Sequence, residues 1–520
     1  MRGKGLILVT LCLAALIINL DTTIVNVALP ALVRQTGATT TDLQWVVDAY
    51  NLTFAALLLA AGSLSDRLGR KGMLLAGIGV FSAASLAGSF ATSAGQLITA
   101  RAVMGLGAAM MFPSTLSLLT NVFTERQERA RAIGLWGACG GVGVALGPIT
   151  GGWLLERFWW GSIFVFMALA AAVVIVGVAI AVPTSRDPAT PPTDWLGLAL
   201  STAGMSLLVF GVIQAPDWGW GAPSTVAALA GGAAVLAGLV AAERVSAHPM
   251  IDMELFRNPR FTAASGAVAI AFFALLGLIF LMTQYFQVVK SFSPLSTGVR
   301  LLPLAASVAV ASIAGTRLAV RIGNKVIVGA GLALFGLALL WISRESQATS
   351  YAIIASQEVL LGAGLGLTQA PAAEAILGAV HVQKAGIASA VNGSTRLFGG
   401  TLGVAVIGSV AASVYASRLA AGLPPRLPAP VVAAAKGSVG GAAVAAQRLS
   451  QAGLGAEARK LDAAAVLAFQ HALNYAGAVA AGVAAAGFVM VVFLLPARPR
   501  ADGTQPGAAS AEPESMQALP

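Results

Sequence analysis

The chain has 520 residues, of which 57% are hydrophobic and only 10% are charged, and its formal net charge is +10. Soluble proteins carry about 25% charged residues, so this composition excludes an ordinary soluble enzyme. Most basic residues stand between apolar runs, where membrane topology accounts for them, and the net charge therefore does not indicate nucleic acid as a partner.

The apolar runs are long and do not alternate polar with apolar residues, which predicts an all-α polytopic protein of the lipid bilayer. The run that follows Arg2 and Lys4 continues beyond the hydrophobic region of a signal peptide, so we interpret it as a retained first span. Fourteen transmembrane helices are predicted, over residues 5–33, 43–65, 73–92, 97–122, 129–155, 160–182, 195–214, 223–242, 262–289, 296–318, 325–343, 350–377, 385–414 and 464–495.

The distribution of Lys and Arg predicts that both termini are cytoplasmic. Segments on the side of the N-terminus are rich in basic residues, whereas the short segments on the other side carry only Arg34, Arg157, Lys290, Arg300 and Arg344. One segment disagrees, because the predicted external loop at about 416–462 is also basic. This loop is rich in Ala, Gly and Pro and has room for one amphipathic helix.

A short repeat supports a division into two six-helix halves. Residues 67–71, between the second and third helices, read RLGRK, and residues 321–325, between the tenth and eleventh, read RIGNK. Repeated halves are typical of transporters with a central site and a rocking mechanism. The predicted organisation is therefore an N-terminal half at 1–182, two inserted helices at 183–261, a C-terminal half at 262–496 and a disordered cytoplasmic tail at 497–520.

Asp21 interrupts the first apolar run. A charge at membrane depth costs about 2.5–3.5 kcal/mol even on lenient insertion scales, so such a residue is expected to handle protons or ions. At about 1.5 Å of rise per residue, Asp21, Asp48 and Arg101 all reach the outer third of the membrane and can share one cluster. Glu358 and Arg396 also lie level with each other in the C-terminal half, which predicts a second buried pair.

The segment GSLSDRLGRK at 62–71 resembles the loop signature of the major facilitator superfamily. The resemblance implies that Asp66 and its basic partners hold the two halves together in one state, with Val320 replacing the acid in the second copy. The simpler alternative is a positively charged membrane anchor. The residues of the expected conformational switch are Gly62, Asp66, Arg67, Gly69, Arg70 and Lys71.

Two further segments resemble signatures of the same superfamily. Residues 101–109, RAVMGLGAA, resemble its fourth-helix signature, which implies a role for Arg101 in proton transfer; the alternative is that Arg101 reaches outward to the interface. Residues 143–152, GVALGPITGG, resemble the antiporter signature, with plain helix packing as the alternative. The residues of this antiporter motif are Gly143, Gly147, Pro148, Gly151 and Gly152.

Other stretches, at 20–30, 44–50, 293–298 and 396–405, resemble the fourteen-span drug:proton antiporter branch of the superfamily. The resemblance implies a proton-coupled exporter of small amphipathic drugs or antibiotics in the cell membrane, with Asp21 as the coupling carboxylate, Arg101 as its modulator and Asp48 in reserve. Two alternatives remain: a dedicated exporter of an endogenous peptide, lipid or siderophore, and a non-transporting membrane receptor on the same fold.

No enzymatic chemistry is predicted. The chain has no phosphate-binding Gly-Lys-Ser/Thr loop and no Cys/His metal spacing, and both cysteines, Cys12 and Cys139, stand in apolar runs. His248, His381 and His471 fall in loops or near helix ends. We therefore expect no cofactor and no metal, with a small amphipathic molecule, protons and the bilayer as partners of a monomer.

Overall fold

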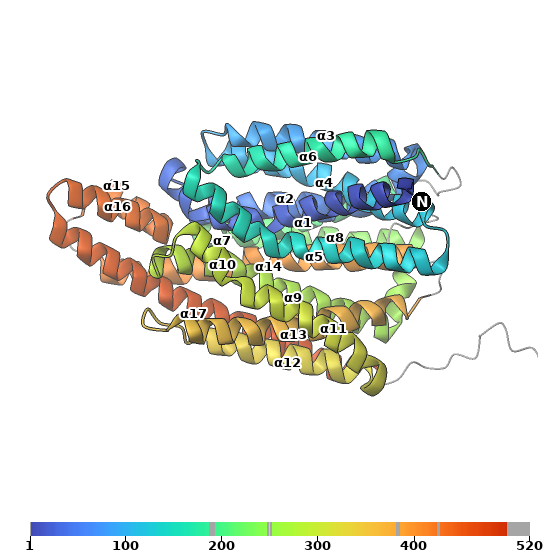
Figure 1. The fold of residues 1–520 in the computed structure, drawn as a ribbon. Helices are drawn as coiled ribbons and strands as arrows, with labels where there is room; N and C mark the ends of the chain where they lie inside the picture. The colour runs from blue at the N-terminus through green and yellow to red at the C-terminus, as the bar shows by residue number, and fades with distance from the viewer. Residues whose placement is uncertain are drawn as a thin grey trace, which may run out of the picture.

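The computed structural model describes residues 2–186, 193–246, 249, 252–380, 385–423 and 427–496. Every regular element within these ranges is a helix, and the helices lie roughly along one axis (Figure 1). We call the end of the bundle that carries the start of the first helix the proximal end, and the opposite end the distal end. The tail predicted at 497–520 lies outside the described residues, as do His248 and His381.

Fourteen helical stretches are long and apolar enough to cross a membrane, which confirms the predicted number of spans. The elements are α1 (Arg2–Thr36), α2 (Thr40–Leu68), α3 (Arg70–Ser89), α4 (Ala94–Val122), α5 (Arg126–Arg157), α6 (Ser162–Ala181), α7 (Trp195–Trp218), α8 (Pro223–Val245), η1 (Met253–Arg257), α9 (Pro259–Gln284), η2 (Tyr285–Val289), α10 (Pro294–Arg300), α11 (Leu302–Ile322), α12 (Asn324–Ile342), α13 (Tyr351–Leu377), α14 (Ala385–Gly422), α15 (Ala429–Gly437), α16 (Val439–Gln451) and α17 (Gly455–Leu494).

The helices form two six-span halves. In the N-terminal half α1 packs on α5 and α6, and α4 packs on α2 and α3; in the C-terminal half α13 packs on α11 and α12, and α14 packs on α9 and α17. Figure 1 shows α3 and α6 on one side of the molecule and α12 and α17 on the other. The inserted helices α7 and α8 pack on each other, and α7 contacts both α2 and α14, so it lies along the seam between the halves.

The repeated segments adopt the same backbone conformation. Gly69 separates α2 from α3 with φ +120°, and Gly323 separates α11 from α12 with φ +92°. In each case the glycine N–H donates to the carbonyl four residues earlier, on Ser65 or Ala319. A residue with a Cβ is strained at these φ values, which explains why both copies of the segment keep the glycine.

The tenth span differs from the prediction of one helix over 296–318. It consists of α10 and α11, which are separated at Leu301. Pro303 stands two residues later, and a proline has no N–H to donate to the preceding turn. The division places α10 as a separate short helix against α5 of the other half.

The external segment at 416–462 also differs from the prediction, because it holds two helices rather than one. α14 continues to Gly422, α17 begins at Gly455, and α15 and α16 form a hairpin between them. Figure 1 shows the α15–α16 hairpin at the distal end. Thr40 Oγ1 donates to Gly437 O (3.0 Å) and Tyr415 Oη donates to Ala435 O (2.9 Å), so the hairpin is bonded to both halves.

Candidate functional site

The structure brings Asp21 on α1 and Arg101 on α4 into a buried ion pair. Arg101 Nη1 lies 2.5 Å from Asp21 Oδ2, and the two side chains are 0% and 1% exposed. Arg101 Nε also donates to Val46 O on α2 (3.1 Å), and the guanidinium lies 4.3 Å from the centre of the Tyr50 ring. Arg101 therefore ties three helices together, and the alternative that it reaches out to the membrane interface is wrong.

Asp48 belongs to the same region but has no partner. It lies on α2, its side chain is fully buried, and neither carboxylate oxygen accepts a hydrogen bond. A buried ionised carboxylate without a donor or a counter-ion is very costly, and protonation removes most of that cost. Of the three residues expected to share one cluster, two are thus in direct contact, and the third is buried without a partner.

Polar residues precede and follow Asp48 on the same face of α2. Gln44 Nε2, one turn earlier, donates to Val404 O (3.1 Å) and Ala405 O (2.9 Å) of α14 in the other half. Asn51, one turn later, is buried with its Oδ1 unpartnered. The contact of Gln44 with the other half was not predicted. The i, i+4, i+7 spacing of Gln44, Asp48 and Asn51 is the sequence signal that predicts a shared face of the helix.

Aromatic rings extend from the ion pair toward the proximal end. The Tyr50 ring contacts Phe54 (5.9 Å between centroids), Phe54 contacts Phe112 (5.8 Å), and Phe112 contacts Trp136 on α5 (5.1 Å). Tyr50 and Phe54 are buried, whereas Phe112 and Trp136 are partly exposed. This aromatic series was not predicted, because its members come from three helices and share no local sequence pattern.

The loop signature makes its described contacts within the N-terminal half and its connection to α7. Arg70 Nε lies 2.6 Å from Asp66 Oδ1, and Lys71 Nζ donates to Ala179 O at the end of α6 (2.9 Å). The Arg70 backbone N–H donates to Ser185 O (2.9 Å), and Arg67 is exposed. Gly62, at the other end of the signature, faces Pro113 of α4 at ordinary contact distance. In this conformation the charges of the loop do not join the two halves.

The antiporter motif presses α5 closely against α1. A Cβ at Gly143 would lie 2.5 Å from Leu16 O, and one at Gly147 would overlap with Thr23 Oγ1. Thr23 Oγ1 donates to Val144 O (3.0 Å), so the close approach is bonded across the two helices. These glycines therefore allow the backbones of α1 and α5 to approach closely.

The same motif also contacts the other half through α10. A Cβ at Gly152 would lie 2.5 Å from Pro294 O, and a Cβ at Gly298 would meet the carbonyl of Pro148. Gly151 instead packs against Ile24 of α1. The motif therefore lies where α1, α5 and α10 meet, on the seam between the halves.

The second predicted pair is not formed in this structure. Both carboxylate oxygens of Glu358 are buried without a hydrogen-bond partner. The Arg396 guanidinium lies over the Phe272 ring, 5.2 Å from its centre, and makes no ion pair among the described residues. Equal depth in the membrane is necessary for the two side chains to pair. Contact also depends on the rotation of α13 and α14 about their axes, and the hydropathy pattern does not determine that rotation.

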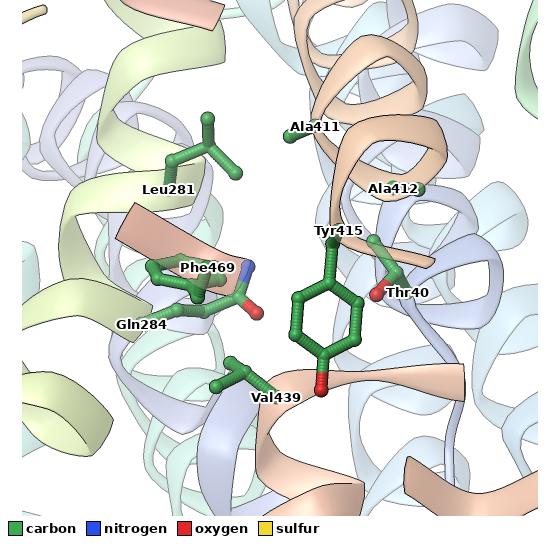
Figure 2. A pocket seen from close by; sticks show the side chains of 8 residues that line it. All are labelled: Thr40, Leu281, Gln284, Ala411, Ala412, Tyr415, Val439 and Phe469. Atoms are coloured by element: carbon green, nitrogen blue, oxygen red, sulfur yellow. The ribbon is translucent and has the colours of Figure 1, made fainter. Parts of the chain in front are cut away.

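Every hydrogen bond that joins the two halves within the described residues lies toward the distal end. Besides the bonds of Gln44, Gln287 Nε2 donates to Val27 O (2.9 Å), and the Leu295 N–H donates to Glu156 Oε1 (3.3 Å). A small cavity at this end is lined by Gln284, Tyr415 and Val439 among others (Figure 2). Its volume of about 10 Å³ accommodates roughly one water molecule, so this cavity between the halves is too small for a drug-sized molecule. A larger hollow of about 290 Å³ at the same end is lined by α14 and α17 of the C-terminal half alone.

Metal-ligating residues do not gather in the part of the chain that the structure describes. No group of three or more His, Cys, Asp or Glu side chains there is arranged to hold a metal ion.

Comparisons with known proteins agree with this geometry. The family model described as Major Facilitator Superfamily matches residues 11–404. Multidrug efflux pump LfrA of Mycolicibacterium smegmatis is 37% identical over 445 residues, which cover 85% of this chain and 87% of that protein. Multidrug resistance protein Stp of Mycobacterium tuberculosis is 36% identical over 430 residues (83% and 80%), and the methylenomycin A resistance protein of Streptomyces coelicolor is 34% identical over 411 residues (78% and 86%).

Solved structures show the same fold at low sequence identity. A bacterial homologue of the human lysosomal transporter Spinster, in an inward-facing and occupied conformation, aligns with a TM-score of 0.69 and 16% identity. The alignment covers 95% of this chain and 98% of that one.

Proposed function

Because the chain belongs to the Major Facilitator Superfamily, we propose that it is a proton-coupled antiporter that exports small amphipathic drugs or antibiotics by alternating access. The observation that carries the proposal is the ion pair of Asp21 and Arg101, which is fully buried inside two membrane-spanning helices. A charged pair at this depth is costly to bury, and ionisable residues inside membrane spans commonly mark the pathways of protons, ions or substrates. The names of the relatives, a multidrug efflux pump and antibiotic resistance proteins, favour drugs as the exported molecules.

In the proposed orientation both termini are cytoplasmic, the protein is a monomer in the cell membrane, and the distal end is extracytoplasmic. The excess of Lys and Arg in the connections at the proximal end supports this orientation. The hydrogen bonds of Gln44 and Gln287 then close the outer side of the transporter. In this proposal, the structure represents the state in which the halves are joined at the outer side.

Coupling is assigned to the two N-terminal carboxylates. In the distally closed state Asp21 is ionised and paired with Arg101. Asp48 is protonated in this state, because an ionised carboxylate without a partner is costly to bury. Opening of the seam between α2 and α14 brings water to Asp48 and allows its proton to exchange. A cationic substrate then competes with the proton for the same charges.

The two signature segments are assigned to conformational change. In the state that opens outward, the proximal ends of the halves approach, and the charges around Asp66 become available to the C-terminal half. The glycines of the antiporter motif keep α1, α5 and α10 in close contact while the distal end is closed. Loss of the charges around Asp66, or of the glycines of the antiporter motif, shifts the balance between the outward-open and the distally closed state.

A second candidate is an exporter of a product made by the cell itself. Two relatives carry names of this kind: the cephamycin export protein CmcT of Amycolatopsis lactamdurans, 34% identical over 416 residues, and the tetracenomycin C resistance and export protein of Streptomyces glaucescens, 31% identical over 407 residues. The breadth of the substrate range separates this candidate from a multidrug pump.

The proposal is tested in a host that lacks its own efflux pumps. Expression of the full chain should raise resistance to several chemically unrelated amphipathic drugs, and a protonophore should abolish the corresponding efflux. Resistance to a single product would favour the second candidate. Efflux that persists after the proton gradient has been collapsed would contradict proton coupling.

A further inference from the structure

Glu345 is a buried carboxylate in a connecting segment. It lies between α12 and α13, outside the membrane-spanning helices, yet it is only 3% exposed. Charged side chains in connections are normally exposed, and those that are buried are normally paired. The neighbouring Arg344 is exposed, so the chain places the acid rather than the base inside.

The carboxylate of Glu345 is only half satisfied. Oε2 accepts a hydrogen bond from Tyr285 Oη (3.1 Å), whereas Oε1 has no hydrogen-bond partner. Gln357 on α13 and Thr349 in the same connection lie close enough to interact with the carboxylate. With its amide nitrogen turned inward, Asn474 of α17 donates to Glu345 O (3.2 Å), which holds the connection in place.

Lys290 is the one cation whose charge acts on Glu345 among the described residues, and Tyr285 is the one titratable neighbour in direct contact. Lys290 Nζ donates to Gln347 O (2.7 Å) and Thr349 O (2.5 Å), so it is committed to the backbone of the connection. Burial raises the pKa of Glu345, and the hydrogen bond from Tyr285, the nearby polar side chains of Gln357 and Thr349 and the charge of Lys290 oppose that rise without cancelling it.

One turn of helix connects this carboxylate with the seam between the halves. Tyr285 begins the π-helical turn η2, and Gln287, two residues later, donates to Val27 O on α1 of the other half. π-Helical turns are rare and are frequently found at functional sites. The ring that contacts Glu345 and the amide that joins the halves therefore move together.

We propose that Glu345 is a proton-binding site of the extracytoplasmic face, and that its protonation favours closure of the distal seam through Tyr285 and Gln287. The assignment of this face as extracytoplasmic rests on the orientation given under the proposed function. The contacts of Glu345 do not depend on that orientation. In the closed state the unpartnered oxygen makes the ionised form costly, and opening hydrates it. Closure is thus stabilised at acidic pH, and this stabilisation is lost as the pH rises through the pKa of the closed state.

The test measures the distance across the seam in the full chain. Spin labels are attached at Gln35→Cys, at the end of α1, and Ala348→Cys, beside Glu345, because both positions are exposed. Cys12 and Cys139 are replaced by Ser, and the protein is studied in lipid nanodiscs without substrate. The closed population should fall as the pH rises, and a difference of one pKa unit between the states changes its ratio to the open population by about tenfold.

Three variants isolate Glu345. Glu345→Gln should stay closed across the pH range, Glu345→Asp should keep a pH response, and Glu457→Gln, which removes a carboxylate elsewhere at the distal end, should titrate like the parent. The same comparison in an Asp48→Asn background removes an unpartnered carboxylate on α2, and the effect of Glu345→Gln should persist there. A response to pH that survives Glu345→Gln, or a parent protein whose distances do not change with pH, would overturn the proposal. This distance measurement uses neither drug nor proton gradient. A failure of drug export in the earlier experiment would therefore contradict only the proposed function and not the role of Glu345.

Discussion

Asp21 and Arg101 face each other from α1 and α4 at 2.5 Å, and both side chains are excluded from solvent. Arg101 uses Nη1 for the carboxylate and Nε for the backbone of α2, while its Nη2 has no partner. The pair therefore anchors three helices, and either charge becomes an unpaired buried ion when the other is removed.

We expect Asp21→Asn to abolish efflux driven by a proton gradient. Asp21→Asn and Arg101→Gln should each also lower the stability in detergent, by about 3–5 kcal/mol, because each leaves a buried charge unpaired. The double variant should recover most of this stability without recovering transport. Thermal unfolding and transport in vesicles give the two readouts. If Asp21→Asn still exports drug at the parental rate under a proton gradient, Asp21 is not the coupling residue and Asp48 becomes the candidate.

Asp66→Asn should fold normally and transport poorly. The pair of Asp66 and Arg70 is partly exposed, so its loss costs at most about 1 kcal/mol. Its removal should nevertheless change the balance between the two states of the transporter. Glu128→Gln is the matched control, because it breaks the exposed pair with Lys4 at the same end. Equal transport by both variants in reconstituted vesicles would contradict a role of Asp66 in switching.

Much of the fold was accessible from the sequence because membrane spans leave a strong signal. Fourteen apolar runs, the glycine of each repeated loop and the close-packing motif at 143–152 all correspond to features of the structure. The break at Leu301 and the π-helical turn at Tyr285–Val289 were missed, since both are deviations within otherwise continuous apolar helices.

The candidate site was only partly accessible. Depth along each helix placed Asp21 and Arg101 correctly, because a rise per residue is fixed by the helix itself. Depth did not reveal that Glu358 and Arg396 fail to meet, because contact also requires the rotation of each helix about its axis. The burial of Glu345 was not predicted, because the elements that cover this side chain are far apart in the sequence.

Gly147→Ala should destabilise the contact of α1 and α5. The added Cβ would overlap with Thr23 Oγ1 and press on Leu20 O, and overpacking of this kind costs about 1–3 kcal/mol. Gly141→Ala on the same helix is the control, because no atom lies within 4 Å of its Cβ position. Thr23→Ala should rescue Gly147→Ala in part. Identical melting temperatures for the two alanine variants would show that the close approach is not needed.

Glu358→Gln should be tolerated, and its effect should add to that of Arg396→Gln. Glu358 has no hydrogen-bond partner in the distally closed state, so removal of its charge does not leave another charge unpaired. Folded yield and thermal unfolding of the two single variants and the double variant provide the measurement. A coupling energy above about 0.5 kcal/mol would indicate that the two residues interact in this state after all.

Trp136→Ala should weaken the export of planar aromatic cations more than that of aliphatic ones. Trp136 is the partly exposed end of the aromatic series that leads through Phe112 and Phe54 to Tyr50 and the buried ion pair. A cation over an aromatic ring gains about 0.5–2 kcal/mol, so the loss should raise the KM for such a substrate by up to roughly thirtyfold. Trp136→Phe keeps a ring and should retain most of the affinity. Trp153→Ala removes an exposed indole from the distal part of the same helix and serves as the control. If all substrates lose affinity equally, the ring supports the packing of α4 and α5, where Trp136 Nε1 donates to Thr115 Oγ1 (3.1 Å), and does not guide the cation.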